Sequence, residues 1–264
     1  MMIAKTAVTL LLLVVAGYAG LCLLLYVMQR SMLYFPTAEV YRSDIEVVRL
    51  KSGKEVLKVW QLEGDNDQAV LYFGGNAEDV ALNIEQFKRI FPGYSVFLLN
   101  YRGYGGSTGT PTEKGLYADA ASLFDYADKR YKRVSVVGRS LGTGVAMDLA
   151  ANRTVEKLIL VTPFDSMVNV AKAHYPLLPV SLMLKDRYTS VDKVDGFRMP
   201  ILVVTAEDDL VVPRKRSDDL IALLPPELVE AVIIEGVDHS SVCANPVYEQ
   251  AVRTFMGIAE VIDR

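Results

Sequence analysis

The pentapeptide G-R-S-L-G at residues 138–142 is the segment of the chain best suited to chemistry. It follows an apolar, β-branched run at residues 134–137 and opens a helix-like stretch at residues 141–151. A tight turn from strand to helix, with glycine on each side of a serine, is typical of a nucleophile elbow. The helix N-terminus at the turn favours developing negative charge. We therefore predict that Ser140 is a nucleophile; the alternative is an ordinary turn in which the glycines only relieve steric crowding.

A serine hydroxyl is a weak nucleophile unless a base accepts its proton and an acid orients that base. The chain holds two histidines, His174 and His239. His239 lies in the loop directly after the last predicted strand, residues 229–234, where it can lean over the elbow. His174 lies in an amphipathic patch of a predicted insertion, and we expect a packing role for it. We therefore predict that His239 is the general base.

The orienting acid is expected between the nucleophile and the base in sequence, at the end of another strand. The apolar run at residues 201–205 leads into three adjacent carboxylates, Glu207, Asp208 and Asp209. All three are candidates, because one must face the histidine while its neighbours are solvated or hold the turn. The order serine, acid, histidine along the chain is that of α/β-hydrolases and differs from the orders of chymotrypsin and subtilisin.

Acyl transfer also requires hydrogen-bond donors for the negatively charged oxygen that develops in the reaction. One donor should be the backbone N–H of Leu141, the residue after the predicted nucleophile. The second should come from the loop after the predicted strand 69–73, which reads G-G-N-A at residues 74–77. We predict the amide of Asn76 as this donor, with Ala77 as the alternative. A plain turn from strand to helix, with Asp79 or Asn76 as the helix cap, is the other interpretation.

Short apolar runs alternate with helix-like segments through most of the chain, and these elements must position the candidate residues. Fully apolar strands separated by helices indicate a mostly parallel central sheet with helices on both faces. The predicted strands are residues 45–50, 55–62, 69–73, 94–99, 134–137, 157–161, 201–205 and 229–234. The predicted helices are residues 79–91, 115–131, 141–151, 217–224 and 247–262. We therefore predict one α/β domain over residues 31–264.

Residues 165–197 interrupt this alternation between two predicted strands. They contain Pro176 and Pro179, with aromatic and aliphatic residues around them. Because ligand sites in such sheets form among the loops at the carboxyl ends of the strands, we predict a small cap over the active site. Ordinary packing over a sheet edge is the alternative.

The N-terminal segment is uncharged over residues 7–28 and rich in leucine and valine. A helix of about 20 apolar residues spans a bilayer, so we predict a transmembrane anchor within residues 1–30. A cleavable signal peptide is the alternative, although the run is longer than a typical signal-peptide core. Lys5 favours a cytoplasmic N-terminus, whereas Arg30 and Arg42 lie on the other side of the apolar run. We favour the orientation with the catalytic domain on the non-cytoplasmic side.

Composition excludes several classes of function. The 264 residues carry a formal net charge of −4 with no Lys/Arg cluster, which argues against nucleic-acid binding. Cys22 lies inside the apolar N-terminal run, so it and Cys243 form no disulfide framework. Two histidines, without a C-x-x-C or H-E-x-x-H motif, exclude a histidine-rich metal site. We expect no metal and no organic cofactor.

Several longer motifs together resemble α/β-hydrolases of the BEM46 type, a group that includes ABHD13-like and ABHD17-like serine hydrolases. The matching segments are QRSMLYFP at residues 29–36, FGGNA at 73–77, NYRGYGGS at 100–107, GTPTE at 109–113, GRSLG at 138–142 and EDDLVVP at 207–213. The resemblance implies an α/β-hydrolase fold, a single-pass anchor and Ser/Asp/His catalysis. The family's acid stands five residues before the proline of the last motif, which maps onto Asp208. The family often has H-G-N where this chain has G-G-N at residues 74–76.

The expected activity is hydrolysis of carboxylic esters or acyl thioesters through a covalent acyl-enzyme. The residues predicted to carry it are Ser140, Asp208 and His239 as the triad, with Leu141 and Asn76 as the oxyanion donors. The bilayer contact through residues 7–28 and the apolar segment 175–184 favour a lipid-like acyl substrate. A peptidase or amidase of the same fold is one alternative. A non-catalytic, membrane-anchored scaffold is another, although a scaffold has no need of all three triad residues.

Overall fold

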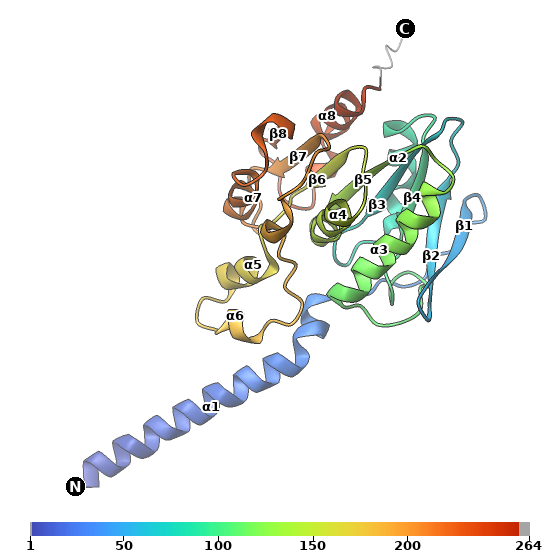
Figure 1. Ribbon diagram of the computed structural model, residues 1–264. Coiled ribbons are helices and arrows are strands. Elements are labelled where there is room, and N and C mark those ends of the chain that lie inside the picture. The colour runs from blue at the N-terminus through green and yellow to red at the C-terminus, as the bar shows by residue number, and fades with distance from the viewer. Residues whose placement is uncertain (1, 259–264) are drawn as a thin grey trace.

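An eight-stranded sheet runs through the domain in the computed structural model, which describes residues 2–258 (Figure 1). The strands are β1 (Glu46–Ser52), β2 (Glu55–Leu62), β3 (Gln68–Phe73), β4 (Ser95–Leu99), β5 (Arg133–Arg139), β6 (Leu158–Val161), β7 (Ile201–Ala206) and β8 (Val229–Ile234). Their order is β1-β2-β4-β3-β5-β6-β7-β8. β2 pairs antiparallel with β1 and β4, and every other neighbouring pair is parallel. The prediction of a mostly parallel sheet is confirmed.

The central parallel strands are buried on both faces, which explains their uninterrupted apolar sequences. Every residue of β4 and β6 is buried. β8 forms one edge of the sheet, and Ile234 is its one buried residue. Because β5, β6, β7 and β8 run parallel, the loops that follow them gather along one edge of the sheet. The predicted nucleophile, acid and base all belong to loops at this edge.

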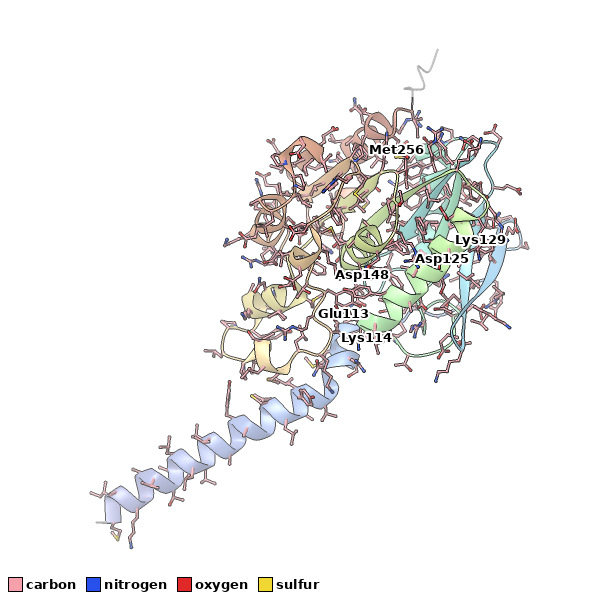
Figure 2. All side chains as sticks on the ribbon, in the orientation of Figure 1. Glu113, Lys114, Asp125, Lys129, Asp148 and Met256 are labelled. Carbon is pink, nitrogen blue, oxygen red and sulfur yellow. The ribbon has the colours of Figure 1, made fainter. Side chains whose placement is uncertain are left out.

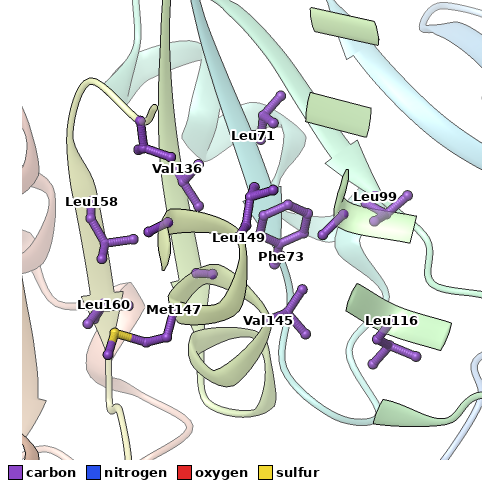
Figure 3. Packing of buried hydrophobic residues seen from close by; sticks show 14 of the residues in the cluster. Leu71, Phe73, Leu99, Leu116, Val136, Val145, Met147, Leu149, Leu158 and Leu160 are labelled. Carbon is purple, nitrogen blue, oxygen red and sulfur yellow. The ribbon is translucent and has the colours of Figure 1, made fainter. Parts of the chain in front are cut away.

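Helices cover both faces of the sheet. They are α2 (Ile84–Ile90), α3 (Glu113–Asp128), α4 (Leu141–Asn152), α5 (Met167–His174), α6 (Val180–Met183), α7 (Arg214–Ile221) and α8 (Pro246–Met256). α3 and α4 contribute to the hydrophobic core on one face, and α2 and α8 to the core on the other. Figure 3 shows Met147 and Leu149 of α4 in the first core, beside strand residues such as Val136.

Some predicted helix boundaries differ from the observed ones. The predicted helix 217–224 begins three residues earlier as α7, directly after Pro213, whose fixed φ suits the start of a helix. The predicted helix 79–91 is a 3-10 turn, Val80–Asn83, followed by α2. α8 ends at Met256 because Gly257 adopts a left-handed conformation with φ 74°. The predicted end of the closing helix at residue 262 lies outside the described residues.

The N-terminal helix α1 (Met2–Leu33) has 32 residues, none of them buried. Its most apolar window has a mean hydropathy of 2.6, and the helix is long and apolar enough to cross a membrane. Figures 1 and 2 show α1 projecting from the domain, with its side chains free along most of its length. The predicted apolar segment therefore forms one continuous helix, a candidate membrane anchor.

The insertion at residues 165–197, here called the cap, contains α5 and α6 and lies beside the C-terminal turns of α1 (Figure 1). Arg30 of α1 forms a bidentate ion pair with Asp186 of the cap, with N–O distances of 2.8 and 3.1 Å. The side-chain amide of Gln29 donates to the carbonyl of Met183 and accepts from the amide of Lys185. The cap is thus joined to the candidate anchor as well as to the sheet.

Candidate active site

Ser140 joins β5 to α4 in a strained backbone conformation. Its φ of 49° and ψ of −118° lie in a region that L-residues rarely adopt. A Cβ at Gly138 would lie 2.6 Å from the carbonyl oxygen of Gly142, and a Cβ at Gly142 would lie 2.0 Å from that of Phe73. Neither position has room for a side chain, which explains why glycine flanks the serine. This is the geometry of a nucleophile elbow.

His239 bridges Ser140 and an aspartate. Its Nε2 lies 2.9 Å from Ser140 Oγ, and its Nδ1 lies 2.7 Å from Asp209 Oδ2. The side chains of His239 and Asp209 are 12% and 4% exposed. A carboxylate at Nδ1 favours the tautomer in which Nε2 is free to accept the proton of the serine hydroxyl. The arrangement can therefore generate a serine nucleophile and return the proton to a leaving group.

The acid that contacts His239 is Asp209, so the assignment of Asp208 by resemblance is wrong. Glu207 and Asp208 follow β7 in an exposed turn, and the amide of Asp208 donates to the carbonyl of Val237 at 3.1 Å. Asp209 is buried, and its Oδ1 accepts two backbone amides of its own turn at 2.9 and 2.7 Å. Those bonds hold its Oδ2 toward His239. The turn after β7 thus decides which of the three adjacent carboxylates points inward.

The loop after β3 passes directly beside the elbow. A Cβ on Gly75 would lie 3.5 Å from the Cβ of Ser140. The backbone N–H groups of Asn76 and Leu141 donate to no acceptor within residues 2–258 and are therefore available to a substrate oxygen. The amide of Ala77, the alternative donor, is already bonded to the side-chain oxygen of Asn76 at 3.0 Å. The geometry thus favours Asn76 over Ala77 as the second donor.

Gly74 is the position at which the resembling family often has histidine. A Cβ there would lie 2.8 Å from Cγ1 of Val80. The carbonyl of Gly74 also accepts the hydroxyl of buried Tyr101 at 3.0 Å. The loop is therefore packed around a glycine at this position, and a histidine would require the start of the following helical turn to shift.

Sequence reasoning missed Glu78, which connects the loop after β3 to the elbow. Its Oε2 accepts the amide of Gly75 at 2.5 Å and Nη1 of Arg139 at 3.1 Å. Its Oε1 accepts the hydroxyl of Tyr72 at 2.5 Å. Arg139 also donates, through Nη2, to the backbone carbonyl of His239 at 3.1 Å. One carboxylate and one guanidinium therefore tie together the loops that carry the oxyanion donors, the nucleophile and the base.

The pairing with Glu78 stabilises the buried charge of Arg139. Burial by itself disfavours the charged guanidinium, but the carboxylate of Glu78 outweighs it and raises the pKa of Arg139 above its usual value. The sequence signal for this ion pair is the arginine directly before the predicted nucleophile, because a cation in a tight turn needs a carboxylate partner. Its partner is distant in sequence and could not be identified from the pattern.

The side chain of Asn76 joins the same loop to the end of α1. Its Nδ2 donates to the carbonyl of Leu33 at 2.7 Å, and its Oδ1 accepts the amide of Phe35 at 3.0 Å. Tyr34, which lies between Leu33 and Phe35 in sequence, is buried. Its hydroxyl shares a hydrogen bond of 2.8 Å with the hydroxyl of Tyr188. The chain that leaves α1 is thus bonded to the residue whose amide is a candidate oxyanion donor.

Within the described part of the chain, no group of three or more His, Cys, Asp or Glu side chains is arranged to hold a metal ion. Both cysteines are free thiols. Burial raises the pKa of Cys243 to about 11, so this thiol is protonated near neutral pH and is a poor nucleophile.

Comparison with known sequences identifies relatives of this chain. Residues 68–195 match the family described as the α/β hydrolase fold. The chain is 34% identical over 239 residues to the uncharacterized protein Rv2307c of Mycobacterium tuberculosis, and the alignment covers 84% of each protein. It is 31% identical over 241 residues to the lysophosphatidylserine lipase ABHD12 of Macaca fascicularis. That alignment covers 79% of this chain and 60% of the longer relative.

Solved structures share the fold. The esterase Pf2001 of Pyrococcus furiosus aligns with a TM-score of 0.66 and 16% identity, over 85% of this chain and 95% of that one. Est1E of Butyrivibrio proteoclasticus, solved with ferulic acid bound, aligns with a TM-score of 0.65 and 18% identity, over 79% and 97% of the two chains. These identities show the fold alone. Together with the family match and the bacterial relative, they show that the chain belongs to the α/β hydrolase family.

Proposed function

We propose that the chain is a membrane-anchored serine hydrolase that cleaves carboxylic esters or acyl thioesters. The observation that carries the proposal is the continuous contact from Asp209 through His239 to Ser140. The strained φ of Ser140 supports it further, since such strain costs about 1–3 kcal/mol and persists mainly at functional sites. The ABHD12 relative, named a lysophosphatidylserine lipase, favours ester substrates over amides.

In the proposed reaction, Ser140 Oγ attacks the acyl carbon while its proton moves to Nε2 of His239. The carbonyl oxygen becomes negatively charged and accepts the N–H groups of Asn76 and Leu141. His239 then donates the proton to the leaving alcohol or thiol, and the acyl group stays on the serine. Water, deprotonated by His239, releases the carboxylic acid and restores the serine. Asp209 holds the histidine tautomer throughout and stabilises the imidazolium.

Anchoring is part of the proposal. Residues 1–30 would form the anchor and residues 31–264 the catalytic domain, with the cap at residues 165–197. The orientation that we favour has Lys5 on the cytoplasmic side and the domain on the other. Within the α/β hydrolases, the longer motifs favour the BEM46 type, including its ABHD13-like and ABHD17-like members. The long exposed apolar helix and the lipase relative favour a lipid-like acyl substrate.

The test is turnover by the full-length chain, in detergent, of p-nitrophenyl esters of rising chain length and of one palmitoyl thioester. Ser140→Ala should reduce turnover by about 10³-fold or more. Ser122→Ala, at a serine on α3 away from the elbow, is the matched control and should retain wild-type rates. A fluorophosphonate probe should label the wild type and the control but not Ser140→Ala.

Two outcomes would contradict the proposal. Folded wild-type protein that neither binds the probe nor turns over any ester would favour a non-catalytic scaffold. Labelling of Ser140 together with cleavage of amides, and no cleavage of esters, would favour a peptidase or amidase of the same fold.

A further inference from the structure

A cavity of about 280 Å³ lies between the last turns of α1 and the cap. Its wall is mainly aliphatic and includes Leu25, Met32 and Leu33 of α1 and Val170, Ala171 and Met183 of the cap. Two of its polar side chains, Gln29 and His174, are hydrogen-bonded to backbone groups. A ligand in this cavity therefore meets mostly hydrocarbon, which favours an apolar chain over a polar group.

Both walls of the cavity are bonded to loops of the candidate active site. On the α1 side, the carbonyl of Leu33 accepts the side chain of Asn76 at 2.7 Å. On the cap side, Nε2 of His174 lies 2.9 Å from the carbonyl of Val211, and the amide of Val211 donates to Asp209 at 2.9 Å. The cavity thus lies between a segment tied to the oxyanion loop and a segment tied to the acid.

The tip of the cap lies alongside the apolar part of α1. The hydroxyl of Tyr18, inside the uncharged segment 7–28, donates to the carbonyl of Leu177 at 2.8 Å. Leu177 and Leu182 are 86% and 88% exposed. Large aliphatic side chains exposed in this way are unfavourable in water and favourable in lipid. The exposed leucines at the tip of the cap and the apolar part of α1 therefore lie next to each other and favour contact with lipid.

We propose that the cavity binds the acyl chain of a membrane lipid ester and admits it sideways from the bilayer, between α1 and the cap. The proposal rests on the hydrolase function proposed above and specifies its substrate class. The cavity volume is close to the lower end of ligand pockets, about 300 Å³, and therefore suits one acyl chain rather than two. Hydrogen bonds tie one wall of the cavity to the loop of the candidate oxyanion donor and the other wall to the turn of the acid.

The experiment compares Ala171→Phe with Ala173→Phe in the full-length chain in phosphatidylcholine vesicles. Ala171 lines the cavity, whereas Ala173 is exposed on the same helix and does not line it. Ala171→Phe should lower kcat/KM for p-nitrophenyl palmitate about tenfold, because the ring occupies the cavity. The kcat/KM of Ala171→Phe for p-nitrophenyl butyrate should stay within about twofold of the wild-type value. Ala173→Phe should change kcat/KM for neither ester.

A second measurement does not depend on turnover or on a folded cavity variant. Full-length Ser140→Ala in the same vesicles is irradiated with a palmitic acid that carries a diazirine on its chain, and the labelled peptides are identified by mass spectrometry. Labels at the cavity-lining residues Leu33, Val170 and Ala171 are expected, beyond any at the exposed Leu177 and Leu182. Labels confined to residues 7–24, as for any lipid-facing helix, would overturn the proposal.

The outcomes separate this inference from the proposed function. Equal losses on both esters in Ala171→Phe, or no loss on either, would show that the cavity does not bind the acyl chain, while the hydrolase proposal stands. Labelling of the cavity in Ser140→Ala, together with a wild-type protein that hydrolyses no ester, would contradict the hydrolase proposal and leave the binding site in place.

Discussion

Around Ser140, charged and polar side chains contact one another within hydrogen-bond distance, whereas at the junction of α1 and the cap aliphatic side chains surround a cavity. The first region depends on directional bonds, whose strength falls steeply when distances or angles change. The second depends mainly on apolar contact, which is not directional. Changes near Ser140 should therefore act on kcat for every substrate. Changes at the junction should act on KM and on the preference for chain length.

The two regions meet at Asn76. Its backbone amide is a candidate oxyanion donor, and its side chain holds the chain that leaves α1. One side chain therefore connects the end of α1 to the loop that carries a candidate oxyanion donor.

Apart from removal of the nucleophile itself, the largest effect is expected at the acid. Asp209→Asn should lower kcat by about 10⁴-fold, because an amide at Nδ1 favours the wrong histidine tautomer. Asp208→Asn changes an exposed residue of the same turn, and its kcat should stay within about twofold of the wild-type kcat. Steady-state kinetics on p-nitrophenyl butyrate provide the measurement. A comparable loss in both variants would contradict the assignment of the acid to Asp209.

A smaller effect is expected at Glu78. Glu78→Gln should lower kcat about tenfold to 10²-fold with little change in KM, since displacement of catalytic groups by about 1 Å costs up to about 10²-fold. The protein should also lose about 3 kcal/mol of stability, because the buried guanidinium of Arg139 loses its counter-charge. Glu85→Gln, on the exposed side of α2, is the control for both kinetics and urea unfolding. Loss of stability with unchanged kcat would show that Glu78 has only a structural role.

At Asn76 the expected loss is about tenfold in kcat, for short and long esters alike. Asn76→Ala retains the backbone donor but releases the loop from Leu33 and Phe35, so the donor is held less firmly. Asn152→Ala, at the exposed end of α4, should leave kcat unchanged. A loss restricted to long-chain esters would assign Asn76 to the junction rather than to the catalytic centre.

The smallest effect is expected at Arg30. This side chain is 45% exposed, so its ion pair with Asp186 should contribute about 1 kcal/mol or less. Arg30→Gln should raise KM for p-nitrophenyl palmitate about threefold to fivefold in vesicles, with kcat for the butyrate ester unchanged. Arg153→Gln, which removes an exposed pair with Asp125, is the matched control. Equal changes in the kinetic constants for the two esters would contradict the assignment of chain-length preference to the junction of α1 and the cap.

Local properties were predictable from the sequence alone. The elbow follows from the two glycines around Ser140, because the turn from β5 to α4 leaves no room for side chains. The parallel sheet follows from short, wholly apolar strands, and α1 follows from the length of its uncharged run. Steric crowding, burial and transfer to lipid each depend on residues that are close in sequence. A short segment of sequence is therefore enough to predict the elbow, the strands and α1.

Other features depended on contacts between distant segments. Three adjacent carboxylates follow β7, and only the course of the turn places Asp209 rather than Asp208 against His239. Glu78 and Arg139 are far apart in sequence, and the ordering of β3 beside β5 brings them together. The cavity has one wall from α1 and one from the cap, so neither segment predicts it. The sequence alone determined which residues are able to do chemistry, and the tertiary structure decided which of them meet, because pairing across loops depends on the packing of the whole sheet.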